Sequence, residues 1–445
     1  MNKKMFGVVF ISLILVIPLQ VVVGVSLSGR ARDSAIDVDP ADYLDVIDMI
    51  HHINESLLSY YLEGLVDIGP RFVGSENCSE AALFLYYEFR KLGLDVQIEP
   101  WKFPRYSCQN VVATLEGTDK SSDAVVVVCA HYDTISQPKP YDRSPGALDD
   151  GTGVAAMLAI ANICSHYSFN HTIRFAAVSG EEVGTFGSYA DAKKAYEGNE
   201  NIIAVLNIDT IGYANTTSTG KLLSSFAKDS SKWIISTANQ VAEKYAEQLD
   251  ITVENPLYYP ADHDSYCDFG YCGVMFVQPL IDECHWIHTA NDTLDKVNMS
   301  YFVKASKLLL ATTVELALKP IDIQVRIVTP YEECIYITDR VVFPLIGFNL
   351  YRFGFRAMTY LLGKPIVRVN ISTEEEIKSV HFGVDGFVLH IDHEPPYEWK
   401  IQRTLYSFFP LVGIHTLNVC VCTESGKNAY DEMDIFVLRP LLYRP

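Results

Sequence analysis

The chain has 445 residues, of which 49% are hydrophobic and 20% are charged, and its formal net charge at pH 7 is −20. This length allows two or three domains, and the apolar fraction is sufficient for a large packed core. The negative charge argues against nucleic acid as a partner, because phosphate contacts need a surplus of Lys and Arg. The same acidity keeps an exported protein soluble and includes carboxylates that a divalent metal would neutralise.

The N-terminus has the pattern of a targeting segment. Two lysines precede an apolar run over residues 5–25, and Val22 and Gly24 fit the −3 and −1 positions of a signal-peptidase site. We therefore predict a signal peptide over residues 1–25. The run is also long enough to span a bilayer, so an uncleaved membrane anchor is the alternative. In both cases we expect the rest of the chain to be extracellular, because the sequence shows no second apolar stretch of spanning length.

Three helices are predicted before the first strand of the main sheet. The first begins at Asp39-Pro40, where an N-cap is followed by proline, and the second covers about residues 56–66. The third begins at an N-cap, Ser79, and stops at Gly93.

Apolar runs rich in β-branched residues then alternate with segments of helical spacing. The predicted strands are 125–130, 173–178, 202–208 and 274–278, and the predicted helices are 153–164, 187–196, 232–248 and 301–316. Strands without internal polar alternation, separated by helices, are typical of a parallel sheet covered on both faces. We predict an α/β domain over residues 38–318, with a mostly parallel central sheet and helices on both faces.

Beyond Pro320 the pattern changes to short strand-like runs separated by turn signals. These runs are 321–328, 335–337, 366–371, 379–384, 387–391 and 416–422. Their number and spacing predict an all-β sandwich over residues 320–445.

Acidic and imidazole side chains follow the carboxyl ends of the predicted parallel strands, which is where an α/β sheet places its active site. They are His131 and Asp133 after the first strand, Asp149 after a short excursion, Glu181 and Glu182 after the second, Asp209 at the end of the third, and His288 beyond the fourth. A lone Asp at a strand end is most often a turn or helix cap. So many acids at one rim would repel each other strongly unless cations compensate.

Mixed imidazole and carboxylate ligands suit zinc, with cobalt or manganese as substitutes. Five ligands can serve two ions if one carboxylate bridges them, and such ions lie ~3.5–4 Å apart. A bound water whose pKa falls to about 7 then supplies hydroxide at neutral pH. The sequence therefore predicts two zinc ions per chain.

The motifs around these residues resemble those of the co-catalytic zinc aminopeptidases of the bacterial leucyl aminopeptidase type, whose relatives include glutamate carboxypeptidases and glutaminyl cyclases. The matching segments are His131-Tyr132-Asp133-Thr134, residues 145–153 (Pro-Gly-Ala-Leu-Asp-Asp-Gly-Thr-Gly), Glu181-Glu182-Val183-Gly184, Asn207-Ile208-Asp209 and residues 288–293 (His-Thr-Ala-Asn-Asp-Thr). Gly69-Pro70-Arg71 and residues 261–265 also look like segments of this family. The resemblance covers roughly residues 56–316 and implies a phosphorylase/hydrolase-like zinc exopeptidase fold.

The resemblance also implies a role for each site residue. One zinc would bind His131 and Asp209, the other Glu182 and His288, and Asp149 would bridge them. Glu181 matches the general base, and Asp133 matches a carboxylate that orients His131.

Other motif residues have structural interpretations. Thr134, Asp150 and Asp292 are expected to cap helices or brace turns. His263 either lines the substrate pocket or braces its loop, and a phenol of the neighbouring Tyr258 or Tyr259 is a candidate oxyanion donor. Of ten cysteines, Cys267 and Cys272 are the predicted bridged pair.

We predict a secreted zinc-dependent exopeptidase that removes N-terminal residues from peptides. A carboxypeptidase would need a cationic pocket for the substrate carboxylate, with Arg143 or Arg174 as candidates. A glutaminyl cyclase with one zinc and a catalytically dead receptor ectodomain are further alternatives, although no ligand is lost. The β-module resembles immunoglobulin-like modules through Val384-Asp385-Gly386 and residues 395–399, and is either a spacer or a contact to the cell envelope.

Overall fold

The computed structural model describes residues 46–438, except for 121, 199, 229–230, 256–258, 280–283, 319–322, 331–333, 338–339, 345–358, 363–364, 374, 386, 402–412 and 425–427. The predicted signal peptide, the start of the first helix and Tyr258 therefore lie outside the described residues. The predicted domain boundary stays a prediction, because Pro320 is outside them too and residues 43–445 form one compact unit.

The α/β domain is built on an eight-stranded sheet with the order β1-β2-β4-β3-β5-β8-β6-β7. The strands are β1 Asp95–Lys102, β2 Ser107–Leu115, β3 Ala124–His131, β4 Thr172–Val178, β5 Asn201–Ile208, β6 Leu222–Ala227, β7 Thr252–Glu254 and β8 Gly273–Val277. The four central strands, β4-β3-β5-β8, pair in parallel, as predicted. Outside them β2 joins β4 and β6 joins β8 in antiparallel pairs. The sheet is therefore parallel at its centre and mixed as a whole.

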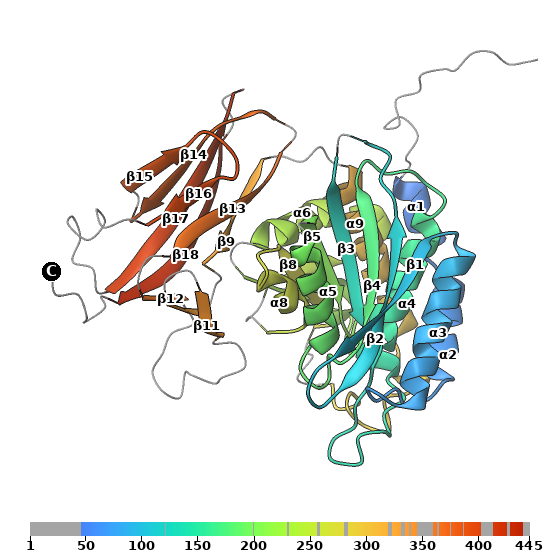
Figure 1. Cartoon of the computed structure of the whole chain (residues 1–445). Coiled ribbons are helices and arrows are strands. Elements are labelled where there is room, and N and C mark those ends of the chain that lie inside the picture. Colours follow the sequence, from blue (N-terminus) through green and yellow to red (C-terminus); the bar gives the residue numbers. More distant parts are fainter. Residues whose placement is uncertain are drawn as a thin grey trace, which may run out of the picture. The chain divides into compact units, whose positions relative to one another are not determined.

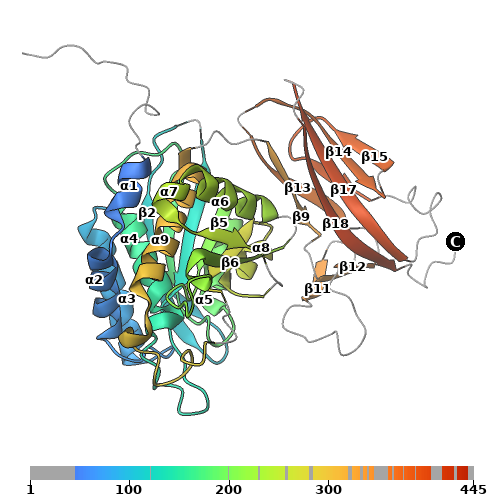
Figure 2. The same ribbon diagram turned by 180° about the vertical axis from the view of Figure 1, so that it is seen from behind.

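Helices cover both faces of this sheet (Figures 1 and 2). They are α1 Val46–His52, α2 Glu55–Val66, α3 Glu76–Lys91, α4 Thr152–Cys164, α5 Phe186–Glu197, α6 Lys232–Lys244, α7 Ala246–Leu249, α8 Asp262–Cys267 and α9 Met299–Leu318. Strand β3 shows the two faces directly, because its side chains alternate between two cores. Val126 and Val128 pack into the core that contains α4 and α9, whereas Val125 and Val127 pack into the core that contains α5 and α8.

The prediction that no second apolar stretch of spanning length exists is wrong, because helix α4 is part of one. The stretch is Ala147–Cys164, and 94% of it is buried inside the protein. Its apolar character is explained by its position between α2, α9 and the sheet, because a helix that is apolar all round belongs in a core.

Several local predictions are incomplete or wrong. Strands β1, β2, β6 and β7 were not predicted; β1 is mostly exposed, so its sequence lacks an apolar run. The third helix is capped by Ser75 rather than Ser79, since the Ser75 hydroxyl accepts a hydrogen bond from the Cys78 amide at 3.1 Å. The predicted Cys267–Cys272 bridge is also wrong: the two cysteines do not form a disulfide, and the Cys267 sulfur contacts Ser231 and Gly273 instead.

The C-terminal residues form two β-sheets, as the change of pattern at Pro320 predicts. The seven-stranded sheet has the order β11-β10-β12-β18-β17-β14-β15, and the three-stranded sheet has the order β16-β13-β9. Their strands are β9 Gln324–Thr329, β10 Cys334–Ile337, β11 Arg340–Pro344, β12 Thr359–Leu362, β13 Ile366–Ser372, β14 Ile377–Val384, β15 Phe387–Asp392, β16 Glu398–Lys400, β17 Gly413–Thr423 and β18 Asn428–Leu438. Side chains from both sheets, such as Val367 and Val419, share one buried core. Of these strands β11, β12, β16 and β18 were not predicted.

Candidate metal centre

The sheet order explains why residues distant in sequence meet. Strands β4, β3, β5 and β8 are parallel neighbours, so their carboxyl ends share one edge. His131 is the last residue of β3, Asp209 directly follows β5, and Glu182 lies four residues beyond β4. His288 arrives from the loop after β8 in a left-handed conformation, with φ 56°.

Asp149 lies between the two histidines. Its Oδ1 is 3.2 Å from His131 Nε2, and its Oδ2 is 3.0 Å from His288 Nε2. Each carboxylate oxygen thus faces a different imidazole, which is the arrangement that a bridging ligand requires.

The two remaining carboxylates lie beside one histidine each. Asp209 Oδ1 is 3.8 Å from His131 Nε2, and Glu182 Oε2 is 3.1 Å from His288 Nε2. The structure therefore brings together all five residues that the sequence predicts as ligands, and their division between two ions stays a prediction. Glu181 is adjacent to Glu182 in sequence, and its amide lies 3.3 Å from Asp133 Oδ1.

The electrostatics of the cluster are dominated by burial and by these contacts. Burial would raise the pKa of Asp149, but hydrogen bonds from His131 and His288 lower it below its usual value. Hydrogen bonds to Asp149 and Glu182 raise the pKa of His288 to about 11. Burial, followed by the charge of Asp149, raises the pKa of Glu182 to about 8. Burial raises the pKa of Glu181 well above its usual value.

The main chain around Asp149 is held by Asp292. The Asp292 carboxylate accepts hydrogen bonds from the amides of Leu148 at 2.7 Å and Asp149 at 3.1 Å. The turn role expected for Asp292 is therefore a brace on the loop that carries the central ligand. Leu148 itself is buried.

Arg71 provides a second brace, which sequence reasoning did not identify. The side chain is fully buried and donates to main-chain carbonyls of Tyr132 at 2.7 Å, Pro145 at 2.7 Å, Gly146 at 3.0 Å and Gly69 at 3.5 Å. Burial lowers its pKa to about 10, so the guanidinium stays charged at neutral pH. One cation thus joins the end of β3 to the loop that leads to Asp149.

The contact between Asp133 and His131 differs from the expected one. His131 Nδ1 lies 3.1 Å from the main-chain oxygen of Asp133 and 3.8 Å from its carboxylate, which is too far for a hydrogen bond. The ring is therefore oriented by the carbonyl oxygen, which fixes the tautomer equally well. Burial raises the pKa of the Asp133 carboxyl to about 6.

The other motif residues take structural roles. Asp150 Oδ1 accepts from the amides of Gly153 and Thr210, both at 2.8 Å, and so supports the start of α4. The Thr134 hydroxyl accepts from the Arg71 amide at 2.9 Å. His263 has no exposed surface, which argues against the substrate-facing role, and Tyr259 is exposed.

The donor set fits a divalent metal of the zinc class. His131, Asp149 and Glu182 have ligand atoms within 4.8 Å of one another, and so do His131, Asp150 and Asp209. Oδ2 of Asp133 and Oδ2 of Asp150 are buried without a hydrogen-bond partner among the described residues. Imidazole and carboxylate ligands in this number suit zinc, and two ions would balance the negative charge that the rim concentrates.

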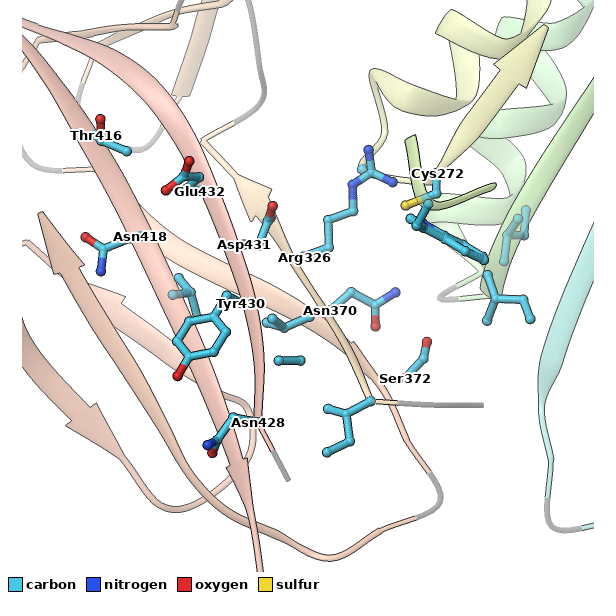
Figure 3. A pocket seen from close by; sticks show the side chains of 18 of the residues that line it. Cys272, Arg326, Asn370, Ser372, Thr416, Asn418, Asn428, Tyr430, Asp431 and Glu432 are labelled. Carbon is cyan, nitrogen blue, oxygen red and sulfur yellow. The ribbon is translucent and has the colours of Figure 1, made fainter. Parts of the chain in front are cut away.

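A cleft runs along strands β9, β13 and β18 of the C-terminal sheets (Figure 3). Polar side chains line it, among them Arg326, Asn370, Tyr430 and Glu432. Of the described residues that line it, none is a predicted site residue. The candidate chemistry is thus concentrated at the edge of the α/β sheet.

Comparisons with known proteins point to the same domain. A probable leucine aminopeptidase of Arthroderma otae is 26% identical over 286 residues, which cover 61% of this chain and 75% of the relative. The crystal structure of the Legionella pneumophila LapA aminopeptidase has a TM-score of 0.55 at 22% identity and covers 62% of this chain and 75% of that one. A zinc aminopeptidase from Bacillus subtilis has a TM-score of 0.50 at 18% identity and covers 61% of this chain and 95% of that one.

The two structural likenesses show the fold. Residues 110–313 match peptidase family M28. This segment contains all five residues that form the candidate metal centre, together with Glu181 and Asp133. The part of this chain that contains the candidate metal centre is therefore similar to peptidase family M28.

Proposed function

We propose that the chain is a zinc-dependent aminopeptidase that hydrolyses the first peptide bond of its substrates. The observation that carries this proposal is Asp149, whose two carboxylate oxygens face His131 and His288 separately. A single bridging carboxylate with one imidazole on each side supports two ions per chain. The names of the relatives, leucine aminopeptidase and zinc aminopeptidase, support the choice of metal and of substrate end.

Zinc bound at this centre would supply a Lewis acid for the substrate carbonyl and would lower the pKa of a water molecule. The protein's own contribution is the proton transfer. Glu181 takes a proton from the attacking water and returns it to the leaving amine. Burial raises the pKa of Glu181, which brings the carboxylate closer to the basicity that such a transfer needs at neutral pH.

The test combines metal analysis with a substrate panel. Aminoacyl and carboxy-terminal fluorogenic peptides should be assayed with and without a chelator, and the purified chain should carry about two zinc ions. We expect hydrolysis of aminoacyl substrates that the chelator abolishes. Full activity with less than one ion per chain contradicts the two-ion scheme. Hydrolysis confined to blocked peptides with a free carboxylate would make the enzyme a carboxypeptidase, and cyclisation of an N-terminal Gln peptide would make it a cyclase.

We also propose that the protein is exported, with residues 1–25 as a cleaved signal peptide and the catalytic domain outside the cell. The lysines and the apolar run at the N-terminus support this proposal. N-terminal sequencing of the protein recovered from its native source tests it: a mature chain that begins near residue 25 is expected, and an intact Met1 in the cytoplasm contradicts it.

For the β-module we propose an immunoglobulin-like sandwich that contacts the cell envelope. Its two sheets around one core support the sandwich assignment. Binding of the full chain to isolated envelopes, compared with a chain that ends near residue 318, tests the contact. Equal retention of both proteins contradicts it, whereas activity of the shorter chain on a dipeptide would show that the α/β domain folds alone.

A further inference from the structure

A cleft of about 920 Å³ opens beside the metal centre at Glu182. Three segments line it: the turn between β1 and β2, the loop that follows β3, and the residues that follow β4 as far as Phe186, the first residue of α5. These segments are distant in sequence and meet because β1, β2, β4 and β3 are neighbours in the sheet. Since Glu182 belongs both to the cleft and to the proposed ligand set, an occupant of the cleft lies next to the reacting bond.

Aromatic rings form the walls of this cleft. The rings of Phe103 and Phe186 stack with their centroids 4.6 Å apart, and Tyr106 lies 6.1 Å from Phe186. Tyr141 is held from behind by a stacked contact with Phe72 at 5.7 Å. All four lining rings are half-buried, so part of each remains available to a ligand. Such walls suit an apolar side chain.

Two cations, Arg105 and Lys139, also line the cleft. Both are exposed, and Lys139 Nζ lies 5.2 Å from the centre of the Tyr141 ring, where a cation–π contact holds it. Neither forms an ion pair with an acidic side chain in the part of the chain that the structure describes. In a chain of net charge −20, two cations beside an acidic rim are a specific feature.

The loop that carries Lys139 is tied to the metal centre. The Ile135 amide donates to Glu182 Oε1 at 3.1 Å, and the Gln137 amide donates to the main-chain oxygen of His288 at 2.9 Å. The loop is therefore positioned by the same residues that hold the metal. The cations predicted from sequence for such a role do not fit it: Arg174 pairs with Glu200, and Arg143 does not line the cleft.

The two cations of the cleft favour one end of a short peptide, because they attract its C-terminal carboxylate. We propose that the cleft binds the residue that follows the cleaved bond, with its apolar side chain against the aromatic rings and its C-terminal carboxylate at Arg105 and Lys139. This inference rests on the proposed aminopeptidase function and names its preferred substrates: dipeptides with an apolar second residue.

The test compares Leu-Phe with Leu-Phe-amide, which lacks only the carboxylate charge. We expect kcat/KM to favour Leu-Phe about tenfold in the zinc-loaded enzyme, because an exposed ion pair between a cation and the substrate carboxylate contributes modestly. The double variant Arg105→Gln/Lys139→Gln should lose this preference. Because the contacts are exposed, added salt should reduce the preference in the natural chain. The control variant is Arg90→Gln/Lys193→Gln, which removes the same net charge from exposed positions elsewhere and should keep the preference.

An unchanged preference in the Arg105/Lys139 variant would overturn the proposal. The enzyme could instead prefer Leu-Glu-amide over Leu-Gln-amide and show no preference for Leu-Phe over Leu-Phe-amide. That result would overturn the assignment to the C-terminal carboxylate, because the cations would then bind a side-chain carboxylate. Hydrolysis of N-acetyl-Leu-Phe but of no unblocked peptide would instead refute the aminopeptidase function. Calorimetry with 3-phenylpropionate and 3-phenylpropanamide tests the cleft without turnover. The acid should bind the zinc-loaded natural chain more tightly than it binds the Arg105/Lys139 variant.

Discussion

The metal centre has two halves, one with His131 and Asp209 and the other with His288 and Glu182. The protein encloses these two halves to different depths. The His131 side chain is 1% exposed and ends a central strand, whereas the His288 side chain is 40% exposed and arrives on a loop. Both contact the same carboxylate, Asp149. The comparison shows that one half is part of the core, while the other is added at the surface, where solvent and substrate reach it.

This difference has a chemical meaning. A ligand at the end of a buried strand keeps its geometry whether or not a metal is bound, because core packing fixes its rotamer. A ligand on an exposed loop depends on the metal and on its neighbours for its position. We therefore expect the His131 half to hold its ion more tightly and the His288 half to exchange its ion more readily.

The largest expected effect concerns Glu181, the proposed general base. Glu181→Gln should lower kcat by about 10³-fold, because it removes the proton acceptor and leaves the ligands in place. Zinc content measured by elemental analysis should stay unchanged. Glu63→Gln, an exposed position on α2, is the matched control. A variant at residue 181 that keeps a normal rate would show that the base is another group.

Removal of either histidine tests the comparison itself. His288→Ala should leave about one zinc ion per chain, held by the His131 half, since the two halves share only the bridging carboxylate. His131→Ala should weaken the binding of both ions, because Asp149 then loses its fixed partner. Equilibrium dialysis followed by elemental analysis measures both variants. Equal zinc loss in the two variants would remove the distinction between a deep and a shallow half.

Substitution of Arg71, which braces the main chain next to the His131 half, should destabilise the protein. Arg71→Lys keeps the charge but cannot reach the carbonyls of Tyr132, Pro145 and Gly146 together, so buried acceptors lose their donors. We expect the free energy of unfolding to fall by about 3 kcal/mol, measured by chemical denaturation. Arg90→Lys, on the exposed face of α3, should change it little. Equal stability of both variants would mean that the guanidinium contacts contribute nothing net.

The smallest effect is a dependence of stability on pH. Burial raises the pKa of Asp262 and of Asp292 to about 7 and that of Glu182 to about 8, above the unfolded values of 3.8 and 4.5. Their contribution to stability is fully present below the unfolded pKa and is lost as pH rises through the folded value. The Tm of the chelated chain should therefore fall between pH 6.5 and 8. This range lies above the usual pKa of His263, which burial lowers to about 4, so that residue adds no opposing change.

Zinc should reverse this trend, because the ions compensate the buried negative charge and bind better as their ligands lose protons. The difference in Tm between the zinc-loaded and the chelated chain should thus widen from pH 6.5 to 8. Differential scanning fluorimetry at matched ionic strength measures it. A difference that narrows with pH would contradict the assignment of the metal to this acidic cluster.

The sequence predicted the parts of the molecule whose signal is local. The central strands are apolar throughout because they are buried on both faces, and each ligand follows such a strand in chain order. Strand β1 could not be found this way, because it is an exposed edge strand. The contact between His131 and the main-chain oxygen of Asp133 was also not predictable, since every residue has a carbonyl oxygen and the residue type does not show where it points. Arg105 and Lys139 were missed because they meet only through the order of the strands.

The clamp made by Arg71 has a consequence for how this enzyme can diversify. Its side chain binds only main-chain oxygens, so it fixes the path of the loop without reading the side chains on it. Substitutions in the loop segments that it holds can accumulate without loosening the central ligand, provided that the backbone keeps its path. Natural variation and laboratory evolution should therefore find new substrate preferences in these segments while the catalytic chemistry is inherited unchanged.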